Sequence, residues 1–134
     1  MKRYVLAAVL AVSVFGATAI IGNTAEAKRP PSVQVEATIS INETDVALGD
    51  WVTFRTTNVT SRSPRIQVMC YQNGTLVYGE AGPADQAFLL GGGMSQWLMA
   101  GGEADCEATV YEWDWHPQQT FVPFATTTFH AGGR

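Results

Sequence analysis

Few side chains in this 134-residue chain could perform catalysis. Ser95 is a candidate nucleophile within Gly93-Met94-Ser95-Gln96-Trp97, but a nucleophile elbow has the form G-x-S-x-G, and Trp97 replaces its second glycine. The two histidines, His116 and His130, lie in an expected turn and near the end of the sequence, with no legible serine–histidine–carboxylate spacing. The sequence therefore predicts a non-catalytic protein, with a secreted hydrolase or an inhibitor of one as the weaker alternative.

Carboxylates are the next group that could bind something. The segment 103–114 carries five acids and no base: Glu103, Asp105, Glu107, Glu112 and Asp114. Calcium needs a loop of closely spaced oxygen ligands, which carboxylates alternating along a strand do not provide. We therefore expect a solvated acidic face, with no metal and no cofactor.

Tryptophan could supply a different chemistry, the stacking of sugar rings. Three candidates for such a platform are Trp97, Trp113 and Trp115. Tryptophan is also commonly used as an anchor in cores and loops, and the sequence leaves that alternative open. A carbohydrate- or small-molecule-binding domain is therefore the second function that we consider.

The first 27 residues have the order of a secretory signal peptide. A basic start, Met1-Lys2-Arg3, precedes an apolar run from Tyr4 to Ile21 and the small-x-small triplet Ala25-Glu26-Ala27. We expect cleavage after Ala27 and a secreted, extracellular protein, with the cell envelope as another possible location. An uncleaved anchor helix is the alternative, because the apolar run is about long enough to span a bilayer.

Export sets the expectation for Cys70 and Cys106, the two cysteines of the chain. In an oxidising compartment, two cysteines in a small domain indicate one disulfide. Two cysteines and two histidines are too few for a cysteine-rich zinc module.

Composition limits the other function classes. The formal charge is −4 for the whole chain, and cleavage after Ala27 would leave 107 residues with a charge of −5. Such a chain is too acidic for binding that depends on phosphate contacts, so we expect no nucleic-acid partner. The length allows one ordinary domain, which we place at 33–130 after a linker at 28–32 that contains Pro30-Pro31.

The elements that must position these side chains are strands. Alternation of apolar and polar residues predicts strands at 33–41, 51–57, 65–72, 75–80, 104–113 and 120–129, with a short apolar one at 86–90. Asn73-Gly74 predicts a two-residue turn that places Cys70 opposite Val77 and Met69 opposite Tyr78. Residues 94–100 could be another strand or a packed loop, and Pro123 indicates an edge strand or a bulge. No strong helical segment is found beyond the signal peptide, so the expected fold class is all-β, with the spacing of a β-sandwich of about seven strands.

One motif resembles a known family. Gly49-Asp50-Trp51-Val52-Thr53-Phe54 is similar to the G-D-x-V-T-F opening of the second strand in many bacterial and bacteriophage immunoglobulin-like domains. The strand order from Val33 to Phe129 is also similar. The resemblance implies an immunoglobulin-like antiparallel β-sandwich that acts as a surface-interaction module. Antibody-type domains join their second and sixth strands by a disulfide, but a count of the expected strands places Cys70 on the third strand and Cys106 on the sixth. These two strands are neighbours in one sheet of this fold.

If both cysteines face the core, the opposite face of their sheet is a candidate partner-binding surface. We expect that face to carry six large side chains: Met69, Tyr71, Leu76, Tyr78, Tyr111 and Trp113. Exposed tyrosine and tryptophan on a rigid sheet give large contact areas at low entropic cost. The expected partner is an unknown protein or a cell-surface glycan, a homodimer is possible, and no membrane contact is expected after cleavage. The alternative is that residues 91–102 fold over this face and bury it.

Overall fold

The structure is a computed structural model, and it describes residues 35–116 and 119–134. Strands dominate these residues, and a single helical turn is the only helix among them, which confirms the all-β fold class. No helix in this part of the chain has the length and apolar character needed to cross a membrane. The expected signal peptide and linker lie outside the described residues.

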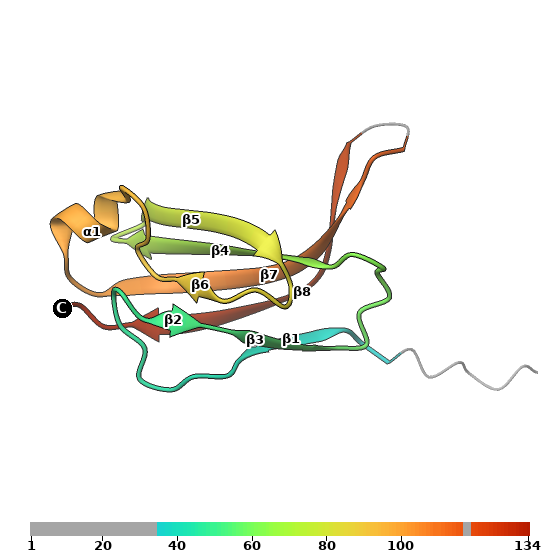
Figure 1. The fold of residues 1–134 in the computed structure, drawn as a ribbon, viewed down its shortest axis with the longest axis horizontal. Coiled ribbons are helices and arrows are strands. Elements are labelled where there is room, and N and C mark those ends of the chain that lie inside the picture. The colour runs from blue at the N-terminus through green and yellow to red at the C-terminus, as the bar shows by residue number, and fades with distance from the viewer. Residues whose placement is uncertain (1–34, 117–118) are drawn as a thin grey trace, which may run out of the picture. The chain divides into compact units, whose positions relative to one another are not determined.

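Four antiparallel strands form the larger sheet, in the order β5-β4-β7-β8. They are β4 (Arg65–Gln72), β5 (Thr75–Pro83), β7 (Ala104–Asp114) and β8 (Thr120–Ala131). Two short antiparallel ladders accompany the sheet (Figure 1). One pairs β1 (Thr38–Ile41) with β3 (Phe54–Thr57), and the other pairs β2 (Trp51–Val52) with β6 (Phe88–Leu89).

The core lies between the ladders and one face of the larger sheet. Phe54 of β3 contacts both Phe88 of β6 and Phe129 of β8, with ring centroids 5.9 and 6.0 Å apart. The larger sheet contributes alternate residues of β4 and β7, as period-two patterning requires. These buried residues are Ile66, Val68, Cys70, Ala104, Cys106, Ala108 and Val110.

The predicted disulfide joins Cys70 and Cys106. The two residues lie directly opposite each other on β4 and β7. The bridge therefore links neighbouring strands within one sheet, as the strand count indicated, and does not join two layers. Both cysteines are buried in the core, and the opposite face of the sheet is the outer face.

The hairpin of β4 and β5 departs from its predicted register. The turn is as expected, since Asn73 and Gly74 both have positive φ and Gln72 opposes Thr75. A bulge between Cys70 and Tyr71 then places Tyr78, and not Val77, opposite Cys70. Because one extra residue exchanges the two faces of a strand, Tyr78 points into the core and is only 5% exposed. Its predicted place on the outer face was wrong.

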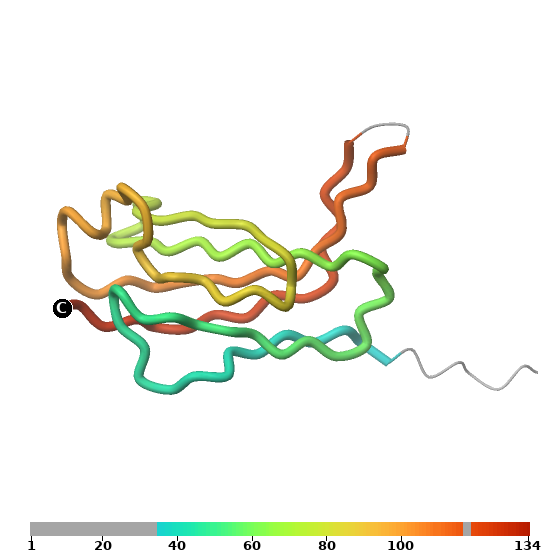
Figure 2. The backbone as a smooth tube through the Cα atoms, viewed as in Figure 1, coloured from blue at the N-terminus to red at the C-terminus, as the bar shows by residue number. Residues whose placement is uncertain are grey.

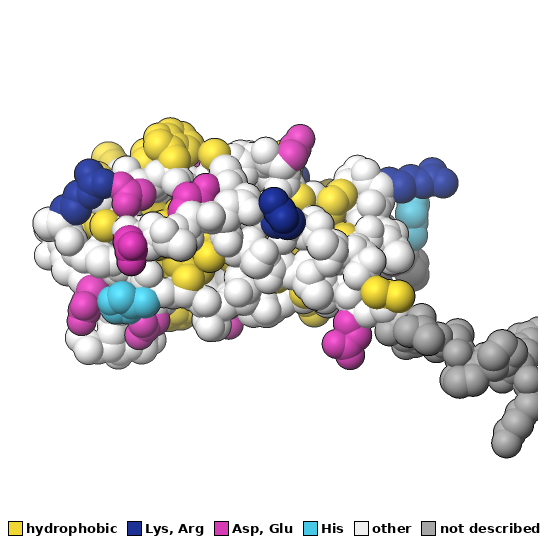
Figure 3. All heavy atoms as spheres, turned by 90° about the horizontal axis from the view of Figure 1, so that it is seen from below, with side chains coloured by type: hydrophobic (Ala, Val, Ile, Leu, Met, Phe, Trp, Pro, Cys, Tyr) yellow, Lys and Arg dark blue, Asp and Glu magenta, His cyan; other side chains and the backbone are white. Residues whose placement is uncertain are grey.

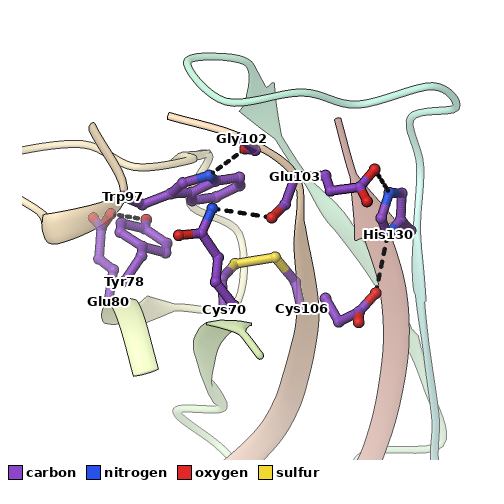
Figure 4. The surroundings of a disulfide bond; sticks show 10 residues. Cys70, Tyr78, Glu80, Trp97, Gly102, Glu103, Cys106 and His130 are labelled. Atoms are coloured by element: carbon purple, nitrogen blue, oxygen red, sulfur yellow. Dashed lines mark hydrogen bonds and ion pairs between the residues drawn. A yellow bond between two sulfur atoms is a disulfide. The ribbon is translucent and has the colours of Figure 1, made fainter. Parts of the chain in front are cut away.

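The segment that could have been a strand or a packed loop contains a helical turn, α1 (Gln96–Ala100). This turn of five residues is the only helix in the described residues, in keeping with the expected absence of a strong helical segment. Ser95 caps the turn by accepting a hydrogen bond from the Leu98 N–H at 3.1 Å, and its hydroxyl donates to the Gly91 carbonyl at 2.8 Å. Trp97 is fully buried, beside Tyr78 and near the disulfide (Figure 4). The segment thus supplies a core side chain.

The long β7–β8 hairpin extends beyond the rest of the sheet. Arg65–Tyr111 is the last pair between β4 and β7, so the residues after Tyr111 pair with β8 alone. A bulge at this point places Pro123 opposite Tyr111 and Ala125 opposite Val110. Pro123 therefore lies both on an edge strand and at a bulge, which confirms that prediction. Bulges bend strands, and Figure 2 shows the hairpin turning away from the sheet.

Candidate functional site

The predicted partner-binding residues do not all lie together on an exposed surface. Met69 and Tyr71 on the outer face of β4 are half-buried, and the Tyr71 hydroxyl lies 3.7 Å from the Met69 sulfur. Leu76 on the neighbouring strand is 49% exposed. Tyr78 is removed from this set because it lies in the core.

Tyr111 and Trp113 lie further along β7, at the base of the bent hairpin. The Tyr111 ring stacks on Phe121 with centroids 4.5 Å apart, and Arg65 Nε lies 3.4 Å from the Tyr111 hydroxyl, to which it donates. These contacts leave Tyr111 only 6% exposed. Tyr111 therefore packs under Phe121 and Arg65 and offers little exposed area to a binding partner.

A groove of about 1220 Å³ lies where the hairpin bends away from the sheet. We call it the hairpin groove. Its apolar lining comes from Tyr111, Trp113 and Trp115 of the hairpin, from Pro64 just before β4 and from Pro83 at the end of β5. The Ala84 N–H donates to the Pro64 carbonyl at 3.0 Å, so a backbone hydrogen bond ties together the loops that precede β4 and follow β5.

The charged lining of the hairpin groove is balanced. Arg62 and Arg65 are opposed by Asp85 and Glu112. These two arginines are half of the four lysine and arginine side chains in the described residues, and the two carboxylates match their charge within the groove. Figure 3 shows that on the face seen from below, the basic side chains lie apart from one another.

Two of the three predicted sugar-stacking residues meet in this groove. The rings of Trp113 and Trp115 are 5.9 Å apart in an edge-to-face arrangement, and Trp115 is 65% exposed. The indole N–H of Trp113 is buried without a hydrogen-bond partner among the described residues. Trp97 does not belong to the set, because its ring is fully buried and its N–H donates to the Gly102 carbonyl at 2.8 Å.

Sequence reasoning missed two arginines of the groove, Arg62 in the loop before β4 and Arg65 at the start of β4. A signal was present, because Ser61-Arg62-Ser63-Pro64-Arg65 places two arginines beside a proline in a chain with few bases. This segment reaches the hairpin because Arg65 pairs with Tyr111 across β4 and β7, and a pattern along the chain does not reveal which distant strands pair.

The acidic segment makes one local cluster with a histidine. His130 on β8 contacts Asp105 at 2.9 Å through Nδ1 and Glu103 at 3.3 Å through Nε2 (Figure 4). The hydrogen bond to Asp105 is the main cause that raises the pKa of His130 above its ordinary value, and Glu103 adds to it. Within residues 35–116 and 119–134, no group of three histidine, cysteine or acidic residues is placed to hold a metal ion.

A second polar pair lies beside the core. The Tyr78 hydroxyl donates to Glu80 Oε2 at 2.6 Å (Figure 4). Burial of the phenol, reinforced by the carboxylate, raises the pKa of Tyr78 far above its ordinary value. The hydroxyl therefore stays protonated and serves as a structural hydrogen-bond donor.

No protein-family model, curated protein or solved structure matches this chain.

Proposed function

We propose that this protein is an exported, non-catalytic binding domain with an immunoglobulin-like β-sandwich. The strand order β5-β4-β7-β8, opposite ladders that contain β1, β3, β2 and β6, supports the proposed fold. An in-sheet disulfide between the third and sixth strands of that fold is consistent with it, because β4 and β7 are adjacent. Export is supported by the order of residues at the start of the sequence and by the disulfide, which persists in oxidising compartments.

The hairpin groove is the proposed binding site, and one observation carries this proposal. The groove brings together an exposed tryptophan, a second tryptophan and two arginines on an acidic domain that has few bases. Binding sites typically combine aromatic surface with a small number of placed polar groups. The ligand is a protein or a glycan outside the cell.

Affinity capture from native extracellular fluid, read by mass spectrometry and glycan analysis, tests the site. The baits are the mature chain, Trp115→Ala and Trp51→Ala. Trp51 is the matched control, since it is 62% exposed but lies on β2, outside the groove. We expect Trp115→Ala alone to lose the captured species. Equal capture by all three baits would place the site elsewhere.

A second candidate function is a protein contact through the outer face near Met69, Tyr71 and Leu76. The observation that favours it is the 49% exposure of Leu76 beside two half-buried apolar side chains. Sedimentation of the mature chain and of Leu76→Ala tests whether this contact makes a homodimer. A dimer that dissociates in Leu76→Ala supports the contact, and a monomer at all concentrations contradicts self-association.

A further inference from the structure

We infer that the ligand of the hairpin groove is an uncharged carbohydrate chain, held by Trp115 and Trp113 and oriented by the four charged side chains of the groove. The inference rests on the proposed function, because it names the ligand class of the same site.

The aromatic part of the groove suits the apolar faces of sugar rings. Trp115 presents 65% of its surface to solvent, and Trp113 lies edge-on beside it. A pyranose has one or two faces made largely of C–H groups, and a flat indole covers such a face. Tryptophan gives this area while fixing few rotatable bonds, so the entropic cost is small.

The charged part of the groove suits hydroxyl groups better than ions. A sugar hydroxyl both donates and accepts hydrogen bonds, and Arg62 and Arg65 offer donors where Asp85 and Glu112 offer acceptors. A polyanion would meet the two carboxylates, and a polycation would meet the two arginines. The balance of two positive and two negative groups therefore favours a neutral ligand that is rich in hydroxyls.

Trp113 provides an additional donor. Its indole N–H is the one side-chain polar atom that is buried and unpartnered in the described part of the chain. A buried donor without an acceptor is unfavourable, and such groups in native structures call for an explanation. Because Trp113 lines the groove, a small rotation of the ring would present this N–H to a ligand hydroxyl or ring oxygen.

The test uses a glycan array that carries neutral and anionic polysaccharide fragments, followed by titration of the bound glycans with tryptophan fluorescence as the readout. The variants are Trp115→Ala, Trp113→Phe and the control Trp51→Ala. We expect neutral glycans to bind and Trp115→Ala to weaken binding by about tenfold or more, as loss of a central aromatic anchor does. Trp113→Phe keeps an aromatic ring but removes the N–H, so a several-fold loss is expected. Trp51→Ala should bind like the parent chain.

Each outcome decides between the two proposals. Neutral glycan binding that depends on Trp115 supports the inference, provided that the variants keep the parent melting temperature. No binding to any neutral glycan, a preference for anionic glycans, or equal binding by Trp115→Ala overturns it. If the array is negative but extracellular capture still depends on Trp115, the groove binds a protein, and only the ligand class is wrong. If both experiments are negative, the proposed function fails as well.

Discussion

Cys70 and Cys106 face each other on strands that are already hydrogen-bonded neighbours. Their bridge therefore adds little to the shape of the sheet. Its main effect is on the unfolded chain, where it closes a loop across a sequence separation of 36 residues. On the chain-entropy model, a loop of this size stabilises the fold by roughly 3–4 kcal/mol.

Removal of the bridge is the first prediction. For a domain of about 100 residues, the lost free energy of unfolding should lower the melting temperature by roughly 15–25 °C. Calorimetry of the mature chain before and after complete reduction measures the change, and thiol titration confirms that reduction was complete. An unchanged melting temperature in the fully reduced protein would contradict the prediction.

The second prediction concerns the pKa of His130. Asp105→Asn should lower the pKa of His130 towards its ordinary value of 6.5, because the hydrogen bond to Asp105 is the largest cause of the raised pKa. Since the folded-state pKa is raised, the contribution of this contact to stability is fully present below pH 6.5 and is lost as the pH rises through the folded-state pKa. NMR titration of the imidazole C–H signals measures the pKa directly.

Glu103→Gln is the matched comparison for that titration. It removes the longer contact, at 3.3 Å, and should lower the pKa of His130 by less than Asp105→Asn does. A larger effect of Glu103→Gln would show that Glu103, and not Asp105, is the main partner of His130.

Among the elements, α1 is short, but its Trp97 side chain is part of the core. A five-residue turn would not persist alone, so its stability comes from Trp97 and from the Ser95 cap. Gly91 allows the chain to enter this turn, since it has a positive φ of 71° and a Cβ there would meet Leu48 Cδ1 at 2.2 Å. Residues 91–100 therefore pack closely against the core at two positions, Gly91 and Trp97.

Truncation of Trp97 is the third prediction. Trp97→Ala should lower the free energy of unfolding by about 3–5 kcal/mol, because it leaves a cavity beside Tyr78 and an unpaired carbonyl at Gly102. Met99→Ala on the same turn is the control, since Met99 is 77% exposed and its truncation should change stability by less than about 0.5 kcal/mol. Denaturant unfolding monitored by circular dichroism measures both. Similar losses in the two variants would mean that α1 is held by something other than Trp97.

At the scale of the whole molecule, the acids outnumber the bases and the two cysteines are bridged. The proposed removal of residues 1–27 would increase the negative charge and leave one lysine, Lys28.

Cleavage after Ala27 is the fourth prediction. When the full chain is expressed with its own leader in a secreting host, the protein in the medium should begin at Lys28 and carry the disulfide. Intact mass, with and without reduction, measures both properties in one experiment. A cell-associated product that retains Met1 would instead indicate the anchor alternative.

The sequence by itself determined the features that are local or periodic. Alternation placed the main strands and the buried faces of β4 and β7, Asn73-Gly74 determined the turn, and Pro123 marked an edge strand or a bulge. Two cysteines in a small domain that was expected to be exported were enough to predict the disulfide. These features could be predicted because each depends on neighbouring residues or on one strong chemical constraint.

The tertiary structure decided which aromatic side chains are exposed. A single extra residue in β5 places Tyr78 in the core, and Trp97 is also buried there. Trp113 and Trp115, in contrast, line the groove at the bent hairpin. The pattern along the chain does not distinguish these outcomes, because a bulge changes the face of a residue without changing its neighbours in sequence. The candidate site likewise depends on residues 62–65 meeting a hairpin some 50 residues later in the sequence, and only the tertiary structure brings them together.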